Sequence, residues 1–284
     1  MPEPDLAPAV AWAERHLGAV RDVRRLEGGW TSTMLQLTPA DGPDAVLRLM
    51  TEEPWRTHGP GLVTREAAVQ TMLAGGDLPA PRSLALDAEG GGCGNPAHLM
   101  THLPGTVQPV GADPVALAAL LARVHAVRPT IEVRTYQSWA WEEKYVVRDW
   151  CRDPGLWEAA FDLLRTPPPA YEPTFLHRDF QPRNVLWDGG RVTGLVDWVE
   201  TSTGPAWLDV AHGATNLAVH AGPGAAEAFS ASYVDVTGAE PQPYYDVMDV
   251  VGFLPPPGRA IFLPEPWQRE RLEDRLRLVM GRLG

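Results

Sequence analysis

One short segment constrains the fold of this chain more than any other, residues 175–198, which read FLHRDFQPRNVLWDGGRVTGLVDW. Two apolar runs flank Asp188-Gly189-Gly190, a pattern that predicts a β-hairpin, because glycine tolerates the backbone angles of a tight turn. The open ends of a hairpin lie together. Asn184 enters the first strand, Asp197 leaves the second, and Asp179 lies on the loop before them. The segment is therefore expected to bring three oxygen-bearing side chains together.

These three side chains have the chemistry that phosphoryl transfer needs. Mg²⁺ is a hard cation that binds carboxylate and amide oxygens together with nucleotide phosphates, and Asp197 and Asn184 offer those oxygens. A further carboxylate, Asp179, would orient an acceptor hydroxyl and accept its proton. The pattern therefore favours transfer of a phosphoryl group from a nucleotide to a hydroxyl.

The residues before this segment divide into two regions with different periodicity. The first hundred predict a small antiparallel sheet with one inserted helix near residues 63–74, where Thr64 marks the start, and a short helix at residues 7–18. The expected strands cover residues 23–26, 34–37, 45–50, 84–86 and 98–102.

After Pro104-Gly105 the pattern becomes mostly helical. Asp113-Pro114 and Asp153-Pro154 each place a capping carboxylate before a first-turn proline, which predicts two helix starts. A last helix is expected from Trp267, with Leu283 on its apolar face. The expected fold class is α+β with two lobes. Residues 1–102 would form an N-terminal nucleotide-binding lobe, and residues 103–284 a C-terminal lobe for catalysis and substrate binding.

The His-x-Asp-x-x-x-x-Asn frame of residues 177–184, followed by Asp197-Trp198, resembles the aminoglycoside phosphotransferase and choline kinase group within the protein-kinase-like fold. The resemblance covers residues 20–215, and the segments that carry it are 23–50, 65–67, 99–105, 113–127 and 204–211. It implies that Asp179 is the catalytic base and that Asn184 and Asp197 bind magnesium. His177 and Asp209 would brace the loop.

The resemblance also implies a nucleotide site with one departure from the protein-kinase pattern. Protein kinases use a lysine on the third strand, paired with a glutamate, to contact the phosphates. Here Arg48 occupies that position and Glu66 would be its partner, while the only lysine, Lys144, falls in the second lobe. The residues expected to contact ATP or GTP are Gly28, Gly29, Thr31, Ser32, Arg48, Glu66, Met100 and Leu103.

Charge and composition exclude several classes of protein. The formal net charge of −12 argues against a nucleic-acid partner, which requires clustered basic residues, and is compatible with a cationic acceptor. No apolar stretch is long enough to span a membrane, and the N-terminus lacks the pattern of a signal peptide, so a cytoplasmic location is expected. Asp235, Asp246 and Asp249 are expected to be solvated surface residues, and His125 a packing or surface residue.

The leading hypothesis is a small-molecule kinase that uses ATP or GTP with Mg²⁺, and its first expected acceptor is an aminoglycoside-type antibiotic. A macrolide, choline, an amino alcohol, homoserine or a sugar remains an alternative acceptor. A non-catalytic nucleotide-binding pseudokinase is the alternative of another class, and only Arg48 favours it. A protein kinase fits poorly, because no Ala-Pro-Glu segment follows Trp198.

Overall fold

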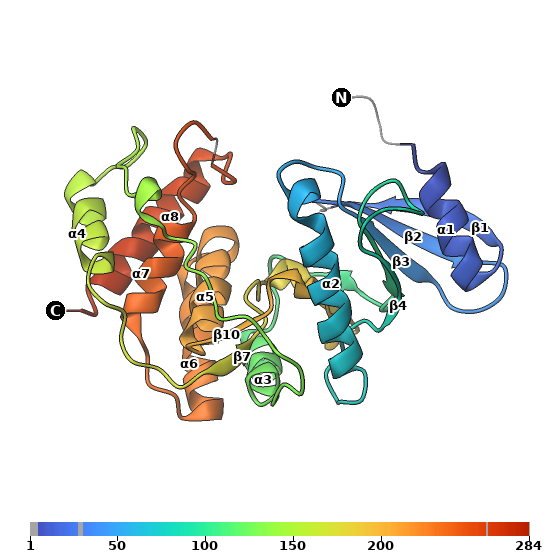
Figure 1. Ribbon diagram of the computed structural model, residues 1–284. Helices are drawn as coiled ribbons and strands as arrows, with labels where there is room; N and C mark the ends of the chain where they lie inside the picture. Colours follow the sequence, from blue (N-terminus) through green and yellow to red (C-terminus); the bar gives the residue numbers. More distant parts are fainter. Residues whose placement is uncertain (1–4, 28–30, 260, 284) are drawn as a thin grey trace. The chain divides into compact units, whose positions relative to one another are not determined.

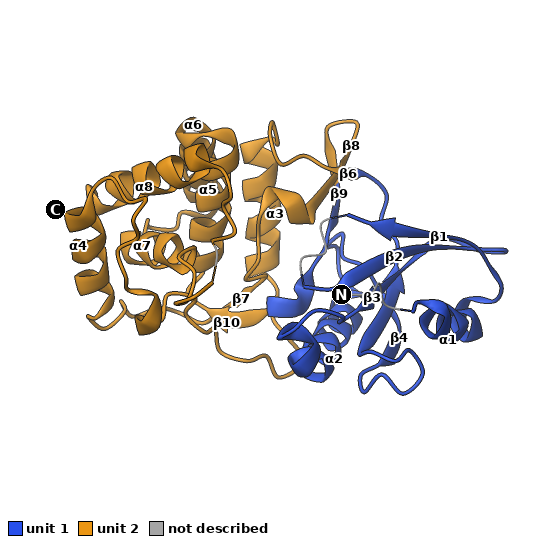
Figure 2. Cartoon of the chain, turned by 90° about the horizontal axis from the view of Figure 1, so that it is seen from above, with its two compact units in different colours: residues 1–105, 193–200 blue, residues 106–192, 201–284 orange. Residues whose placement is uncertain are grey.

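The computed structural model describes residues 5–27, 31–259 and 261–283, and the chain forms two compact units (Figure 2). Unit 1 comprises residues 1–105 and 193–200, and unit 2 comprises residues 106–192 and 201–284. Residues 193–200 thus group with the N-terminal part of the chain. The lobes at residues 1–102 and 103–284, with their assigned roles, stay a prediction.

Unit 1 contains a five-stranded antiparallel sheet with the order β1-β2-β3-β5-β4. The strands are β1 Val20–Leu26, β2 Thr33–Pro39, β3 Ala45–Leu49, β4 Ser83–Asp87 and β5 Ala97–Thr101. Every strand predicted in this region is present. The order places β3 at the centre of the sheet, where both of its faces are buried.

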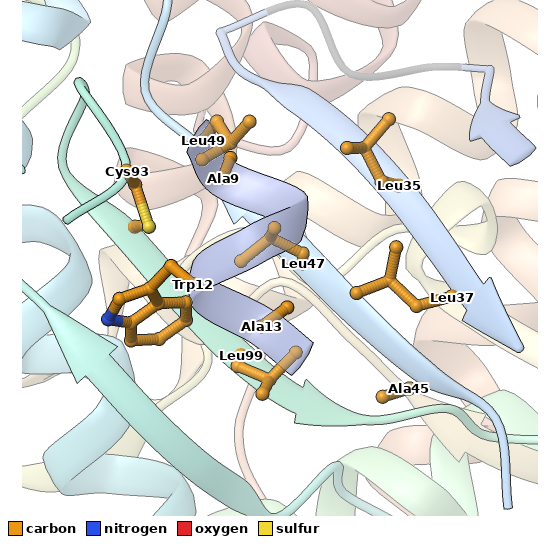
Figure 3. Packing of buried hydrophobic residues seen from close by; sticks show 11 residues of the cluster. Ala9, Trp12, Ala13, Leu35, Leu37, Ala45, Leu47, Leu49, Cys93 and Leu99 are labelled. Atoms are coloured by element: carbon orange, nitrogen blue, oxygen red, sulfur yellow. The ribbon is translucent and has the colours of Figure 1, made fainter. Parts of the chain in front are cut away.

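One face of this sheet packs against helix α1 (Ala7–Leu17), as Figure 3 shows. Trp12 of α1 shares an apolar core with Leu47, Leu49 and Leu99 of the central strands. Because side chains alternate along a strand, Arg48 takes the opposite face from Leu47 and Leu49. The apolar packing of α1 therefore fixes the face on which the Arg48 side chain lies.

Helix α2 (Trp55–Leu73) is longer than predicted, since Thr64 lies inside it rather than at its start. Its first turns contain Gly59 and Pro60, two residues of low helix propensity. Gly59 is buried against Pro96, and a Cβ atom there would lie 2.8 Å from a Pro96 side-chain carbon. The glycine allows a close approach that a larger residue would prevent, so tertiary packing outweighs the weak helix propensity of this stretch.

Unit 2 is mostly helical (Figure 1). Its helices are α3 Pro114–His125, α4 Pro154–Leu164, α5 Trp207–Ala221, α6 Pro223–Thr237, α7 Pro243–Gly252 and α8 Pro266–Met280. The predicted caps of α3 and α4 are confirmed: Asp113 accepts from the Val115 amide at 2.9 Å, and Asp153 from the Leu156 amide at 3.2 Å. Leu283 was predicted on the apolar face of α8, but it lies beyond the helix end and is exposed.

Short strands lie between the helices after residue 105, all in unit 2 except residues 193–195, which belong to unit 1. They are β6 Thr106–Val107, β7 Thr174–Leu176, β8 Val185–Asp188, β9 Arg191–Leu195 and β10 Ser202–Gly204. β8 and β9 are neighbours in a sheet with the order β6-β8-β9, and Gly189 and Gly190 between them have φ angles of 51° and 76°. The turn predicted from Asp188-Gly189-Gly190 is therefore present. Within the described residues, no helix combines the length and apolarity needed to cross a membrane.

Candidate active site

Asp179 lies on the loop between β7 and the 3₁₀ turn Pro182–Asn184, and its carboxylate accepts three hydrogen bonds. His212 Nε2 and Gln181 Nε2 both lie near Oδ1, at 2.9 Å and 2.8 Å, and Asn184 Nδ2 donates to Oδ2 at 2.9 Å. Burial raises the pKa of Asp179, but the His212 contact outweighs it and the net direction is downward. The carboxylate is therefore held ionised, and its orientation is fixed from both sides.

The loop that carries this carboxylate is anchored by Asp209 in the first turn of α5. Its two oxygens accept from the backbone amides of His177 and Arg178, at 2.8 Å and 2.7 Å, and one of them also faces His125 Nε2 at 3.2 Å. Arg178 has a φ angle of 73°, which non-glycine residues rarely adopt. The Asp209 bonds hold this strained backbone in place. His125 was expected to be a packing or surface residue, and it is buried with its ring in this contact.

A second pair of polar residues, His212 on α5 and Asp249 on α7, extends the Asp179 cluster. His212 Nδ1 lies 3.0 Å from Asp249 Oδ1, so the imidazole lies between two carboxylates. Burial lowers the pKa of His212, but Asp249 and Asp179 outweigh it and raise that pKa to about 10. The sequence analysis did not select His212. The available signal was its position three residues after Asp209 on the same helix. Residues three apart are neighbours on the surface of a helix.

The prediction that Asp246 and Asp249 are solvated surface residues is wrong, because α7 is buried along almost its whole length. Asp246 accepts from Arg275 at 2.7 Å and from the Trp207 indole at 2.9 Å. Buried carboxylates need such partners, and each partner lies on another helix, which a local sequence pattern does not show. Asp235 is exposed, as expected.

Unit 1 holds the second group of candidate residues around Arg48. Arg48 Nε lies 3.1 Å from Glu66 Oε2, and Arg48 Nη2 lies 3.0 Å from Asp197 Oδ1. The same oxygen, Glu66 Oε2, also lies 3.0 Å from His98 Nδ1. Burial opposes the charge on Arg48, but Asp197 and Glu66 outweigh it and raise its pKa. His98 was missed, and only the strand register, which pairs it with Arg48, identifies it.

The other predicted nucleotide contacts are described in part. Gly28 and Gly29 lie outside the described residues. Ser32 is buried, with its hydroxyl 3.4 Å from Arg48 Nη1, and Thr31 beside it is half-buried. Met100 lies near the end of β5 and is buried, and Leu103 lies just beyond that strand and is half-buried.

The residues expected to hold magnesium fall in different units, Asn184 in unit 2 and Asp197 in unit 1. The side-chain amide nitrogen of Asn184 donates hydrogen bonds to Asp179. The side-chain carbonyl oxygen of Asn184 is therefore the atom left to bind a metal. Asp197 has a φ angle of 67°. In the part of the chain that the structure describes, no group of three or more His, Cys, Asp or Glu side chains could hold a metal ion. A carboxylate and an amide oxygen suit a magnesium ion that also takes phosphate oxygens.

Comparisons with known proteins give one matching family model and several solved structures with a similar fold. The family model described as "Phosphotransferase enzyme family" matches residues 22–250. The fold is similar to that of aminoglycoside phosphotransferase APH(4)-Ia in a ternary complex with ADP and hygromycin B. That match has a TM-score of 0.67 and 18% identity, and covers 94% of this chain and 97% of that one.

Two further solved structures share the fold. An aminoglycoside-3'-phosphotransferase of type VIII matches with a TM-score of 0.65 and 20% identity, over 87% of this chain and 99% of that one. The macrolide 2'-phosphotransferase MphH from Brachybacterium faecium matches with a TM-score of 0.61 and 19% identity, over 95% of this chain and 98% of that one. No curated protein matches the sequence significantly.

Proposed function

This chain belongs to the phosphotransferase enzyme family, and from that premise we propose that it transfers the γ-phosphoryl group of ATP or GTP to a hydroxyl of a small molecule. The observation that carries the proposal is the Asp179 carboxylate. It is ionised and fixed by His212, Gln181 and Asn184, and within the described residues its Oδ2 atom accepts from Asn184 alone. Such an oxygen can orient an acceptor hydroxyl and take its proton, which is the role of the base in phosphoryl transfer.

Asn184 and Asp197 are the proposed magnesium ligands, through the amide oxygen of the first and the carboxylate of the second. When bound, the metal neutralises charge on the phosphate oxygens. The chain's own residues do the remaining work: Asp179 binds and orients the acceptor hydroxyl, and Asp209 holds the Asp179 loop in place.

Arg48 is the proposed phosphate-binding cation. Glu66 fixes its guanidinium through contacts at 3.1 Å and 3.2 Å, and an arginine fork can bind two phosphate oxygens at once. The similar APH(4)-Ia structures contain ADP or AMP-PNP, which supports ATP as the first donor to test, with GTP as the alternative.

An aminoglycoside is the acceptor we test first, and a macrolide the second. The net charge of −12 suits a cationic antibiotic, and the complex with hygromycin B shows such an acceptor on a similar fold. The similarity to a macrolide 2'-phosphotransferase motivates the second choice. Choline, an amino alcohol, homoserine and a sugar complete the panel.

The test measures ADP or GDP release with magnesium across this panel, for wild-type protein and for Asp179→Ala. We expect acceptor-dependent release in the wild type and a loss of at least about 10³-fold in kcat in the variant, because both base and hydroxyl orientation disappear. Nucleotide binding, measured by calorimetry, is expected to stay within about threefold of wild type, since a residue that acts on the acceptor contributes little to ground-state nucleotide affinity.

Asp188→Ala is the matched control, because Asp188 is an exposed carboxylate at the nearby hairpin turn. It is expected to retain wild-type turnover. Full turnover in Asp179→Ala would overturn the assignment of the base. Nucleotide binding without release for any acceptor would favour the pseudokinase alternative.

A further inference from the structure

His212 occupies an unusual position, because both of its ring nitrogens face carboxylate oxygens. Nε2 lies 2.9 Å from Asp179 Oδ1 and Nδ1 lies 3.0 Å from Asp249 Oδ1. All three side chains come from unit 2, and His212 and Asp249 are almost fully buried. A neutral imidazole has one donor and one acceptor nitrogen, so it cannot donate to two ionised carboxylates. Both contacts can be hydrogen bonds only if the group carries one additional proton. An imidazolium between two carboxylates meets this requirement, because both of its ring nitrogens donate.

Aromatic rings and a backbone bond fix the position of this imidazole. Trp139 meets the ring edge-on with centroids 5.1 Å apart, and Phe253 lies 5.9 Å away. One turn along α5, Asn216 donates to the backbone carbonyl of His212 at 3.0 Å. Its amide nitrogen also lies 3.2 Å from Nε2, but an amide NH₂ and an imidazolium N–H are both donors, so the bond to the carbonyl is the one that holds. Rings on two sides lower the local dielectric constant, which strengthens the attraction between the imidazolium and its carboxylates.

Two further cationic side chains lie near His212, Asp179 and Asp249. Neither takes the place of the imidazolium between the two carboxylates. The Arg178 guanidinium stacks on the Trp139 ring at 3.9 Å and donates to the Gln137 carbonyl. Lys144 donates to the Gly252 carbonyl at 2.6 Å. Burial lowers its pKa, and the negative charge of Asp249 acts in the opposite direction. Both cations are thus engaged with other groups, and His212 is the cation that contacts the Asp179 carboxylate.

The contacts also distinguish the two oxygens of the proposed base. A carboxylate oxygen accepts about two hydrogen bonds. Oδ1 of Asp179 already receives His212 and Gln181, whereas Oδ2 receives only Asn184. An acceptor hydroxyl therefore has a lone pair available on Oδ2 and none on Oδ1.

We propose that His212 is a positioning residue: held by Asp249, it binds Oδ1 of Asp179 and leaves Oδ2 as the oxygen that receives the acceptor hydroxyl. This inference rests on the proposed function, because it assigns a task to the same base. Asp249 acts one step further away, by keeping the imidazole charged and oriented. His212 itself touches neither substrate in this account.

The decisive variant is Asp249→Asn. It keeps the shape of the side chain and removes one of the two negative charges that contact the His212 ring. The pKa of His212 should then fall from about 10 toward its ordinary value of 6.5. We expect kcat to fall about 10-fold or more as pH rises through the new pKa, between about pH 6 and pH 9, a range in which wild-type kcat reports no loss of this proton. KM for the nucleotide should stay within about twofold.

Two further variants separate positioning from a purely structural role. His212→Ala removes both contacts and is expected to lower kcat about 10- to 100-fold at every pH, while His212→Gln, which keeps one donor, is expected to recover part of that loss. Asp246→Asn is the matched control, since Asp246 is an equally buried carboxylate on α7 that contacts Arg275 and Trp207 instead of His212. It is expected to lower thermal stability without adding an ionisation to the pH profile.

A measurement on the wild type keeps the inference testable if the variants fail to fold. The ¹⁵N shifts of the His212 ring, followed by NMR from about pH 6 to pH 9, should be those of an imidazolium throughout. A neutral His212 at about pH 7 would overturn the proposal, as would a wild-type pH profile in Asp249→Asn together with wild-type kcat in His212→Ala.

If wild-type protein turns over no acceptor at all, the proposed function fails and this inference fails with it. If wild-type protein is active and these variants are unaffected, only this inference fails.

Discussion

The two units each bury a group of alternating charges, and the two groups differ in the cation at their centre. In unit 1 the Arg48 network consists of Arg48, Glu66, Asp197 and His98. In unit 2 the His212 network consists of His212, Asp179 and Asp249. Arginine stays protonated at any pH at which a protein is folded, whereas a histidine is charged only while its neighbours keep it so.

This difference suggests a division of tasks between the units. A nucleotide phosphate is anionic over the whole working range of pH, so a permanent cation on a rigid strand serves to bind it. The base needs a fixed orientation and an ionised carboxylate, and a histidine held by a second carboxylate supplies both. The comparison predicts that the Arg48 network is insensitive to pH and that the His212 network can be made sensitive by one substitution.

Arg48→Met should have the largest effect on this comparison, because it leaves Glu66 buried without its main cation. Removing one partner of a buried ion pair costs about 3 to 5 kcal/mol, and the lost phosphate contact should weaken nucleotide binding at least about 100-fold. Chemical denaturation and calorimetry measure the two quantities. Wild-type nucleotide affinity in a folded Arg48→Met protein would contradict the proposed role.

Arg48→Lys is the control for charge alone. Lysine keeps the cation but loses the planar fork that contacts Glu66 and Asp197 together. We expect it to recover most of the stability and only part of the nucleotide affinity. The change in each quantity relative to wild type should not depend on pH between about 6 and 9, since both cations stay protonated there.

The buried Lys144 beside the His212 network should have a smaller, pH-dependent effect on stability. Burial lowers its pKa to about 8, from an ordinary value of 10.5, against the attraction of Asp249. Between these values the unfolded chain holds a proton that the folded chain has released, so the free energy of unfolding rises with pH. Because His212, whose pKa is raised to about 10, contributes in the opposite direction below that pH, the rise due to Lys144, about 2 to 3 kcal/mol, is measured as the difference between denaturant titrations of wild type and of a Lys144 variant.

Lys144→Met and Lys144→Arg should both lose this slope for different reasons, since methionine has no charge and arginine does not titrate in the window. Only the methionine variant also removes the cost of burying a charge. A pH dependence of stability that is the same in wild type and in both variants would contradict the lowered pKa of Lys144.

The sequence predicted the fold where a local pattern decides it. The strands of the first unit, the caps at Asp113 and Asp153 and the turn at residues 188–190 all depend on neighbours a few residues apart. The predicted start of α2 was wrong, because Gly59 and Pro60 lower helix propensity and the close packing of Gly59 against Pro96 compensates. That contact joins positions too far apart for a periodic pattern to show.

For the candidate site, a motif with fixed spacing led to Asp179, Asn184 and Asp197, whose roles stay predictions. His212 and Asp249 were missed because they meet across two helices and their spacing in the sequence belongs to no motif. An acidic residue such as Asp249 also looks like ordinary surface when its helix partner is unknown. Buried polar partners of a motif are thus the residues that a single sequence hides.

His98 should have the smallest effect, because it lies at the outer end of the Arg48 network. Its ring contacts Glu66 through Nδ1 and the Ser83 hydroxyl through Nε2, each at 3.0 Å. In His98→Leu, Glu66 loses one partner but keeps Arg48, so we expect a loss of about 1 to 2 kcal/mol in unfolding free energy. Nucleotide affinity should fall no more than about tenfold, since Arg48 keeps its contact with Glu66.

Ser83→Ala removes only the outer bond and is expected to cost less than His98→Leu in both measurements. A loss in His98→Leu as large as that in Arg48→Met would mean that the histidine, and not the arginine, holds Glu66 in place, and the contrast between a permanent and a titratable central cation would fail for unit 1.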